Sequence, residues 1–146
     1  MPIFFHSEKV NLPKFNPDNL RNWIKYCIIS EKFTCETINI IFTNDTQLIE
    51  INKKYLGRDY YTDIICFDYC QENSIIGDLY ISLDKVEANA KTYNINFSNE
   101  LNRVIIHGIL HLLKYNDQEE IEKKIMKEKE NYYLDIFDKN FSIQHS

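Results

Sequence analysis

The spacing of apolar residues divides the chain into segments with strand or helix periodicity. Strands are predicted at residues 2–10, 37–42, 63–69 and 75–83, with a polar turn at 71–74 joining the last two. Helices are predicted at about 17–32, 44–56, from 84 onward, at about 98–113 and at about 118–138. The order βαβαββααα predicts an α+β fold: a single domain with a mixed four-stranded sheet covered by about five helices.

Capping residues mark where several of these helices begin and end. Asn16-Pro17-Asp18 combines an N-cap, a first-turn proline and an acid, which is typical of a helix start. Thr43-Asn44-Asp45 is expected to cap the second helix, and Gly57 is typical of its end. Ser98-Asn99-Glu100 is expected to begin the fourth helix, and Asn116-Asp117 resembles the cap of the fifth.

The composition suits a single packed domain covering residues 1–146. Hydrophobic residues make up 44% of the chain, which favours a globular fold over disorder, and no internal repeat or linker suggests a domain boundary. The net charge of −5 argues against a nucleic-acid partner, but the segment 117–138, with four lysines and eight acids, accounts for −4 of it. The charge of the remaining residues therefore permits binding of RNA.

Cysteine usage and the lack of long apolar runs indicate a cytoplasmic protein. The four cysteines form no CxxC pair and are expected to be reduced thiols. No segment reaches the roughly 18 uncharged apolar residues of a membrane span, and the first residues lack the pattern of a secretory signal. We therefore expect no membrane partner.

The strongest chemical signal is a histidine pair in the fourth predicted helix. His107 and His111 are four residues apart, so a helix places both imidazoles on one face, one turn apart. Asp117 follows six residues later, where a turn can bring its carboxylate over the pair. Two nitrogens, one oxygen and a position left for water are typical of a catalytic zinc site. The alternatives are packing or surface histidines and an Asp117 that only caps the next helix.

The residue after the first histidine narrows the chemistry. Gly108 stands where an H-E-x-x-H metallopeptidase has its general-base glutamate, which makes a metallopeptidase-like hydrolase the weaker alternative. A glycine inside a helix costs about 1 kcal/mol relative to alanine. Its presence indicates either close helix packing or room for substrate or water beside the metal. A non-catalytic protein whose structural metal is closed by Asp117 and a further side chain is the other alternative.

The segment HGILHLLKYND, residues 107–117, resembles the signature H-G-x-L-H-L-x-G-Y-D-H of the YbeY family of metal-dependent endoribonucleases. Lys114 replaces the family's glycine, Asn116 its aspartate and Asp117 its third histidine, and an aspartate can also bind zinc. Residues 48–67 are similar to the family's helix, Y-R-G-x-D-like turn and T-D-V-L-S-F strand, and residues 75–82 to its L-G-D-I-x-I-S strand.

This resemblance implies a zinc-dependent endoribonuclease acting in 3′-end maturation of small-subunit (16S) rRNA and in ribosome quality control. It implies one Zn2+ per chain on His107, His111 and Asp117, and a functional arginine at Arg58, whose planar guanidinium suits a phosphate. Without the resemblance, Arg58 is equally well a surface ion-pair partner of Asp59. The expected partner is single-stranded RNA, as rRNA on the small subunit, and not DNA. A non-catalytic ribosome-assembly protein stays an alternative.

Four further residues offer weaker signals near this segment. Asp63 and Asp78 are candidates to orient the ligand imidazoles, although a turn or strand-end aspartate is the simpler interpretation of each. Cys66 and Cys70 are possible ligands by residue type alone. Their spacing on a strand and turn favours buried, inert thiols.

Three tyrosines and the two remaining histidines are the last candidate residues. Tyr55, Tyr60 and Tyr61 can stack on bases, or they can simply complete the core or its edge. His6 and His145 lie near the ends of the chain. We expect both to be solvated and without a role in the site.

Overall fold

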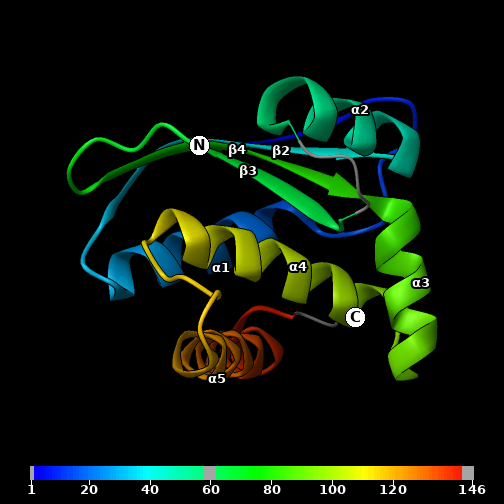
Figure 1. Ribbon diagram of the computed structural model, residues 1–146. Helices are drawn as coiled ribbons and strands as arrows, with labels where there is room; N and C mark the ends of the chain where they lie inside the picture. The colour runs from blue at the N-terminus through cyan, green and yellow to red at the C-terminus, as the bar shows by residue number, and fades with distance from the viewer. Residues whose placement is uncertain (1, 58–61, 143–146) are drawn as a thin grey trace.

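The computed structural model describes residues 2–57 and 62–142 and has the predicted order of elements (Figure 1). Its strands are β1 (Ile3–Ser7), β2 (Thr34–Thr43), β3 (Ile64–Asp68) and β4 (Ser74–Ser82). Its helices are α1 (Pro17–Ser30), α2 (Asp45–Leu56), α3 (Leu83–Tyr93), α4 (Phe97–Leu112) and α5 (Glu120–Ile136), and a π-helical turn, η1 (Phe137–Phe141), extends α5. The predicted α+β fold is confirmed.

The described strands form one mixed sheet in the order β1-β2-β4-β3. β1 and β4 both pair in parallel with β2, whereas β3 pairs antiparallel with β4. β1 and β2 run in parallel because α1 lies between them in the chain and returns it to the same end of the sheet. The β3–β4 hairpin closes at the predicted polar turn, where Gln71 and Ser74 form an isolated β-bridge.

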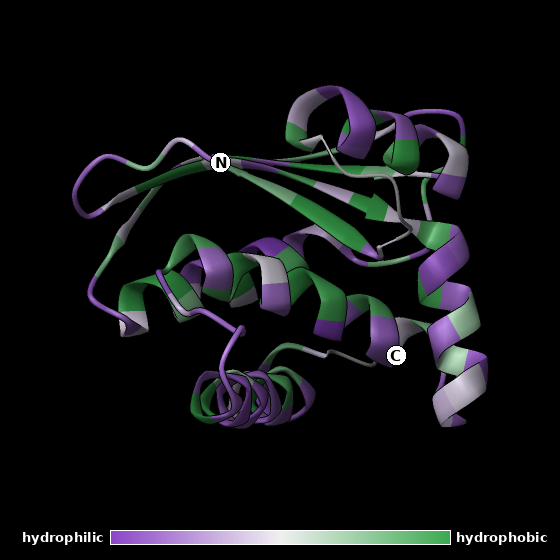
Figure 2. Ribbon diagram, in the orientation of Figure 1, coloured by the Kyte–Doolittle hydropathy of each residue, from purple (hydrophilic) through white to green (hydrophobic). Residues whose placement is uncertain are grey.

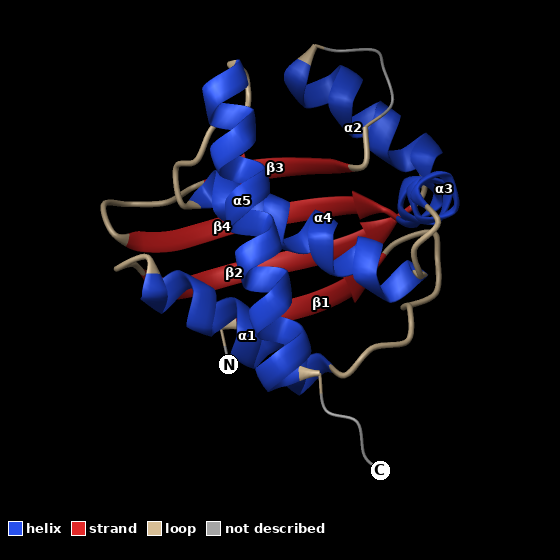
Figure 3. Cartoon of the chain, turned by 90° about the horizontal axis from the view of Figure 1, so that it is seen from below, coloured by secondary structure: helices blue, strands red, loops and turns tan. Residues whose placement is uncertain are grey.

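Helices cover both faces of this sheet. α1 and α4 lie against one face, with α5 beneath them, and α2 lies on the opposite face (Figures 1 and 3). The larger core lies under α1 and α4, and alternate residues of β2 and β4 enter it: Ile38, Ile40, Phe42, Leu79 and Ile81. In Figure 2 apolar residues, coloured green, make up long stretches of the strands and of the helices beneath them, α1 and α4. Among the described residues, no helix has both the length and the apolar character that crossing a membrane requires.

Most of α4 lies in the interior of the protein, and one stripe of it reaches the surface. Ten of its 16 residues are buried, because it crosses beneath the sheet and also contacts α3 and α5. Arg103, His107 and His111 are partly exposed and follow one another at intervals of four residues. One turn of a helix takes 3.6 residues, so these three side chains lie along a single stripe.

Two glycines allow α4 to approach the sheet closely. A Cβ atom on Gly108 would come within 2.6 Å of Ile64 Cδ1 and 3.1 Å of Leu79 Cδ1. A Cβ atom on Gly77 of β4 would come within 2.9 Å of both Leu112 Cδ atoms. Close packing therefore explains the glycine inside α4. The alternative expectation, room for substrate or water beside Gly108, is wrong because apolar side chains fill that space.

The helix ends follow local capping chemistry. Asn16 and Asn44 cap α1 and α2 as predicted, each accepting a hydrogen bond from the backbone N–H three residues later. Gly57 ends α2 in the left-handed conformation, at φ +66°. Ser82 and Asn96 cap α3 and α4, so both helices begin one residue before their predicted first positions of 84 and 98.

Candidate metal centre

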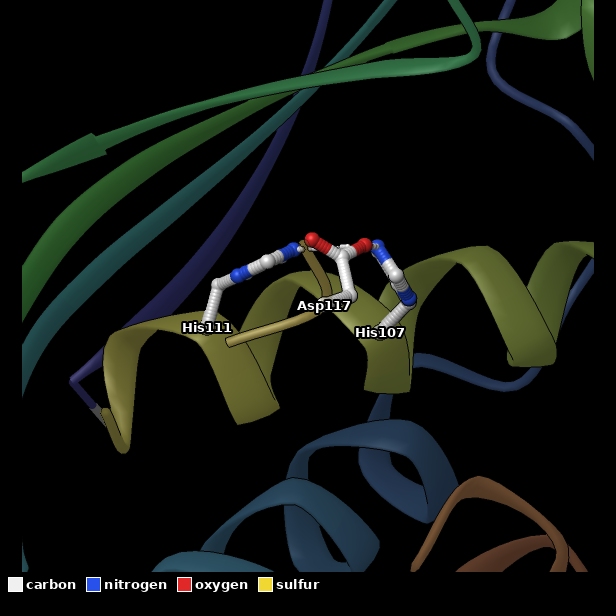
Figure 4. Close-up of side chains that lie close together, drawn as sticks. All are labelled: His107, His111 and Asp117. Carbon is white, nitrogen blue, oxygen red and sulfur yellow. Dashed lines mark hydrogen bonds and ion pairs between the residues drawn. The ribbon is translucent and has the colours of Figure 1, made fainter. Parts of the chain in front are cut away.

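The two histidines predicted as ligands lie side by side on the partly exposed stripe of α4. Their Nε2 atoms are 3.1 Å apart and their ring centroids 4.6 Å apart. Figure 4 shows both rings rising from the same side of the helix, with the Asp117 carboxylate between their tips. The four-residue spacing of His107 and His111 therefore produces the convergence that the sequence predicts.

A tight turn after α4 returns the chain towards the histidine pair. Lys114 adopts φ +80°, and its N–H donates to the His111 carbonyl at 3.0 Å. The Tyr115 N–H donates to the Leu110 carbonyl at 3.0 Å. These two bonds form a Schellman C-cap, which usually has glycine at the left-handed position. Lys114 therefore makes the turn expected of the family's glycine, although a side chain disfavours that backbone conformation.

Asp117 lies against both imidazoles. Its Oδ2 is 3.3 Å from His107 Nε2 and 3.5 Å from His111 Nε2. Glu119 is the N-cap of α5 instead, in a capping box in which its N–H donates to Glu122 Oε1 at 3.1 Å. The prediction that Asn116-Asp117 caps this helix is wrong, because the capping box two residues later already satisfies the backbone there. The Asp117 carboxylate is left to face the histidines.

The three donor atoms have the separations that a single metal ion requires. Around a tetrahedral zinc ion with bonds of about 2.0–2.1 Å, neighbouring ligand atoms are about 3.3–3.4 Å apart. The observed separations of 3.1, 3.3 and 3.5 Å bracket this value. Among the described residues, His107, His111 and Asp117 form the group of side chains that can hold a metal ion. Two imidazoles and a carboxylate therefore fit one divalent cation.

A buried glutamate on α5 fixes the orientation of His107. Glu130 is only 7% exposed, and its Oε2 accepts a hydrogen bond from His107 Nδ1 at 2.6 Å. With the proton on Nδ1, the Nε2 lone pair faces Asp117 and His111, as a metal ligand requires. The other carboxylate oxygen of Glu130 accepts a hydrogen bond from Arg103 Nη1 at 3.1 Å. Glu130, held by Arg103, thus fixes the His107 ring through the nitrogen that does not face Asp117.

Sequence reasoning missed Glu130, although the sequence contains a signal for it. Met126, Glu130 and Tyr133 are the buried residues of α5, at helical spacing. An acid in the middle of an apolar stripe is costly unless it has a partner. That interruption is the feature from which a buried interaction of Glu130 can be inferred.

Burial disfavours protonation of both imidazoles, but their neighbours move the two pKa values in opposite directions. For His107, the hydrogen bond to Glu130 and the charges of Glu130 and Asp117 outweigh burial and raise the pKa above its ordinary value. For His111, burial and the positive charge of a protonated His107 lower the pKa. His111 is therefore the imidazole that is more readily neutral, the form that binds a metal.

Asp63 and Asp78, the two candidates to orient the imidazoles, make hydrogen bonds to asparagine side chains. Asp63 is partly buried, and its charge acts on His107, while burial raises its own pKa. The Asn89 amide donates to it at 3.4 Å. Asp78 accepts a hydrogen bond from Asn39 on the neighbouring strand β2 at 3.1 Å. Asp78 is therefore a strand aspartate, as the simpler interpretation predicts, and the hydrogen bond that orients His107 comes from Glu130.

A pocket of about 600 Å³ opens beside the ligands, between α2, β3 and the C-terminal half of α4. Asp63, Cys66 and Asp68 line it together with His107, His111 and Asp117. Leu56 and Thr62 also line this pocket. Arg58, the predicted functional arginine, lies outside the described residues, as do Asp59, Tyr60, Tyr61 and His145.

The remaining candidates have no place among the metal ligands. Cys66 and Cys70 are free thiols, partly rather than fully buried. Burial raises the pKa of Cys66 to about 12 and, with the neighbouring Asp68, also raises that of Cys70, so both are protonated and inert at neutral pH. Tyr55 is exposed, and its ring contacts the edge of the Phe67 ring and the Lys54 ammonium group. His6 is exposed, as predicted, and its Nε2 lies 2.9 Å from the Asn39 side-chain oxygen.

The fold and the site together define a class of protein. An α+β domain presents two imidazoles on one helix and a carboxylate from the following turn at the separations of metal ligands. A buried carboxylate holds one imidazole from behind, and a pocket opens beside all three groups. Three protein ligands next to an open pocket are typical of hydrolases that use a single metal ion.

Comparisons with known proteins identify the family within this class. The family model described as Endoribonuclease YbeY matches residues 3–138. Proteins named Endoribonuclease YbeY from Parabacteroides distasonis and Bacteroides thetaiotaomicron are 45% and 44% identical, over 93% and 92% of this chain and 96% and 98% of their own lengths. The solution structure of TM1509 from Thermotoga maritima has a TM-score of 0.65 and 29% identity, covering 92% of this chain and 88% of that one. The chain belongs to the endoribonuclease YbeY family, which confirms the prediction of an enzyme of the endoribonuclease class.

Proposed function

We propose that the protein is a zinc-dependent endoribonuclease that cuts single-stranded RNA in the cytoplasm. The convergence of His107, His111 and Asp117 beside an open pocket carries the proposal. Two imidazoles and one carboxylate are a common donor set for zinc, and one ion per chain fits them. When bound there, zinc supplies Lewis-acid activation of a phosphate and of water. The four free thiols agree with a reducing compartment.

The other residues of the site bind and orient. Glu130, held by Arg103, keeps the His107 ring in the tautomer that binds a metal. The pocket of about 600 Å³ beside the ligands receives the RNA strand at the position of cleavage. Arg58 is proposed to contact a phosphate, because its guanidinium can donate two parallel hydrogen bonds to phosphate oxygens.

The finer assignment concerns the identity of the RNA. We propose rRNA of the small ribosomal subunit, cut during 3′-end maturation and ribosome quality control. The resemblance of residues 48–67, 75–82 and 107–117 to the family's signature segments supports it. Gly108 supplies no general base of the metallopeptidase type, and family membership favours a nuclease over both a peptidase and a non-catalytic protein.

Metal content and RNA cleavage measured on the same preparations test this function. The wild-type protein is expected to contain about one zinc per chain and to cut unstructured RNA. His111→Ala should lose most of the metal and the activity while retaining its helical circular dichroism. Equal metal content and equal cleavage in wild type and His111→Ala would show that the proposed centre is wrong.

Arg58 is tested separately from the metal. Arg58→Ala should lower RNA cleavage without changing zinc content, because the residue lies apart from the three ligands in the sequence. Arg58→Lys should restore only part of the rate, since a point charge cannot reproduce a bidentate contact. Unchanged turnover in Arg58→Ala would remove this residue from the proposed mechanism.

A further inference from the structure

A second pocket adjoins the metal ligands and contains cations that the first pocket lacks. It has a volume of about 460 Å³ and shares His107 and Asp117 with the first pocket. Its other residues come from α4, α5 and the end of α3 with the turn after it: Tyr93, Ile95, Glu100, Arg103, Lys123, Met126, Lys127 and Glu130. The described lining of the first pocket includes acids and no lysine or arginine. The two pockets therefore differ in charge and meet at the proposed metal.

Two lysines of the second pocket form no ion pair, within the described residues, with the three acids that also line it, Glu100, Asp117 and Glu130. Lys123 and Lys127 are exposed and one helical turn apart, so both side chains project from the same face of α5. Within the described residues neither side chain makes an ion pair or a hydrogen bond, although α5 is rich in glutamate. By contrast, Arg103 in the same pocket is paired with Glu130. Two unpaired ammonium groups on one wall favour an anionic occupant.

The same pocket contains an unsatisfied buried acceptor and an exposed aromatic ring. Glu100 is 3% exposed, and its Oε1 makes an ion pair with Arg103 Nε at 3.8 Å but no hydrogen bond among the described residues. Because 3.8 Å is too long for a hydrogen bond, a hydroxyl or amino group of a ligand can still donate to this oxygen. Tyr93 is 65% exposed, which leaves a face of its ring available for stacking. The pocket thus offers contacts for a phosphate, a hydrogen-bond donor and a base.

We propose that the second pocket binds the nucleotide adjacent to the cleaved phosphodiester. In this assignment Lys123 and Lys127 contact the phosphate of that nucleotide, Tyr93 stacks on its base and Glu100 accepts a hydrogen bond from its sugar or base. The RNA strand then passes from the first pocket across His107 and Asp117 into the second. The assignment rests on the proposed function and extends it to the path of the substrate.

The test compares two double variants that remove the same charge. Lys123→Ala/Lys127→Ala removes both pocket lysines, whereas Lys124→Ala/Lys139→Ala removes two lysines that do not line the pocket. Binding of a short fluorescent oligouridine is measured by fluorescence anisotropy over a series of salt concentrations. A metal chelator is present so that the RNA is bound but not cut. The pocket variant should bind roughly tenfold more weakly, with a salt slope about 0.7 smaller, because neutralising one phosphate of a single strand contributes about 0.7 to the slope. The control variant should stay within about twofold of wild type.

Cleavage kinetics separate this assignment from the proposed function. The pocket variant should raise KM and leave kcat nearly unchanged, since its lysines contact a phosphate that is not cleaved. Tyr93→Ala should also raise KM, and Tyr93→Phe should not. Equal KM and equal salt slope in the two double variants, with active wild type, would overturn the second-pocket assignment alone. A wild-type protein that neither binds nor cuts RNA would overturn the proposed function as well. Competition by polyglutamate as effective as that by RNA would assign the pocket to an acidic peptide instead.

Discussion

At the scale of single residues, Glu130 decides how well His107 can serve as a ligand. Glu130→Gln keeps a hydrogen-bond acceptor near Nδ1 but removes the negative charge that makes the imidazole a stronger base. Zinc affinity, measured by competition with a chromogenic chelator, is expected to fall about 10- to 100-fold. Glu128→Gln, an exposed change on the same helix, is the control. An affinity equal to that of the control would mean that Glu130 has only a structural role.

Lys114 is a second residue whose backbone makes a testable prediction. Its φ of +80° disfavours any residue with a side chain, so Lys114→Gly should relieve strain of about 1 kcal/mol. The change also removes an exposed ion pair with Asp68, at 2.8 Å, which contributes at most about 1 kcal/mol. We expect a melting temperature higher by about 2 °C. Asp68→Asn removes the ion pair alone, and a Lys114→Gly protein less stable than this control would contradict the explanation from strain.

The residues of the site divide into those that local spacing reveals and those that it does not. His107 and His111 are predictable because helix geometry alone brings them together. Asp117 is reached through one short turn, which the family resemblance helps to locate. Glu130 is 23 residues from His107 along the chain, and its contact depends on how α5 packs against α4. Pattern analysis of one sequence does not supply that packing.

At the scale of elements, Glu31 joins three parts of the fold. It follows the C-terminus of α1, and its carboxylate accepts hydrogen bonds from Tyr115 at 2.7 Å, Lys129 at 3.0 Å and Tyr133. Tyr115 belongs to the turn after α4, and the other two residues belong to α5. Burial raises the pKa of Glu31, but these hydrogen bonds and the charge of Lys129 outweigh burial and lower it below its usual value. The junction is therefore strongest when Glu31 is ionised.

This junction predicts a dependence of stability on acid. Since folding lowers the pKa of Glu31, its contribution is present above the unfolded value of 4.5 and is lost as pH falls through the folded value. The free energy of unfolding in urea should therefore fall less between pH 6 and pH 3.5 in Glu31→Gln than in wild type. Glu87→Gln, in an exposed pair with Lys91, serves as the control. Identical pH dependence in wild type and Glu31→Gln would refute the role of the junction.

The elements themselves follow closely from the sequence, and their ends less closely. Periodicity identifies every described strand and α-helix in the right order because each buries one face, whereas it does not predict the π-helical turn η1. Asn16, Asn44 and Gly57 mark boundaries correctly since their capping is local. The sequence prediction starts α5 too early, at about residue 118, because two possible caps, Asn116-Asp117 and Glu119, lie close together. The capping box that Glu119 forms with Glu122 selects the second of them.

At the scale of the whole molecule, the order of the strands in the sheet is the feature that could not be predicted from the sequence. Placing β4 between β2 and β3 requires pairing between residues some 40 positions apart, such as Asn39 and Asp78. The alternation of apolar residues reports which face of a strand is buried but not which strand is its neighbour. The fold class could therefore be predicted, whereas the faces on which the two pockets open could not.

The position of Asp117 beyond the end of α4 has a consequence for local unfolding. A metal ion held by His107, His111 and Asp117 would close a small loop between α4 and α5, so that opening of this turn would break a coordination bond. Amide hydrogen exchange near residues 113–120 should therefore slow when zinc is added, and Asp117→Ala should lose this protection even where the histidine pair still holds metal. Equal amide exchange rates in residues 113–120 with and without zinc would argue against Asp117 as a ligand. If the metal is bound as proposed, its removal would leave a protein that opens first at the turn between α4 and α5, and protease attack would begin there.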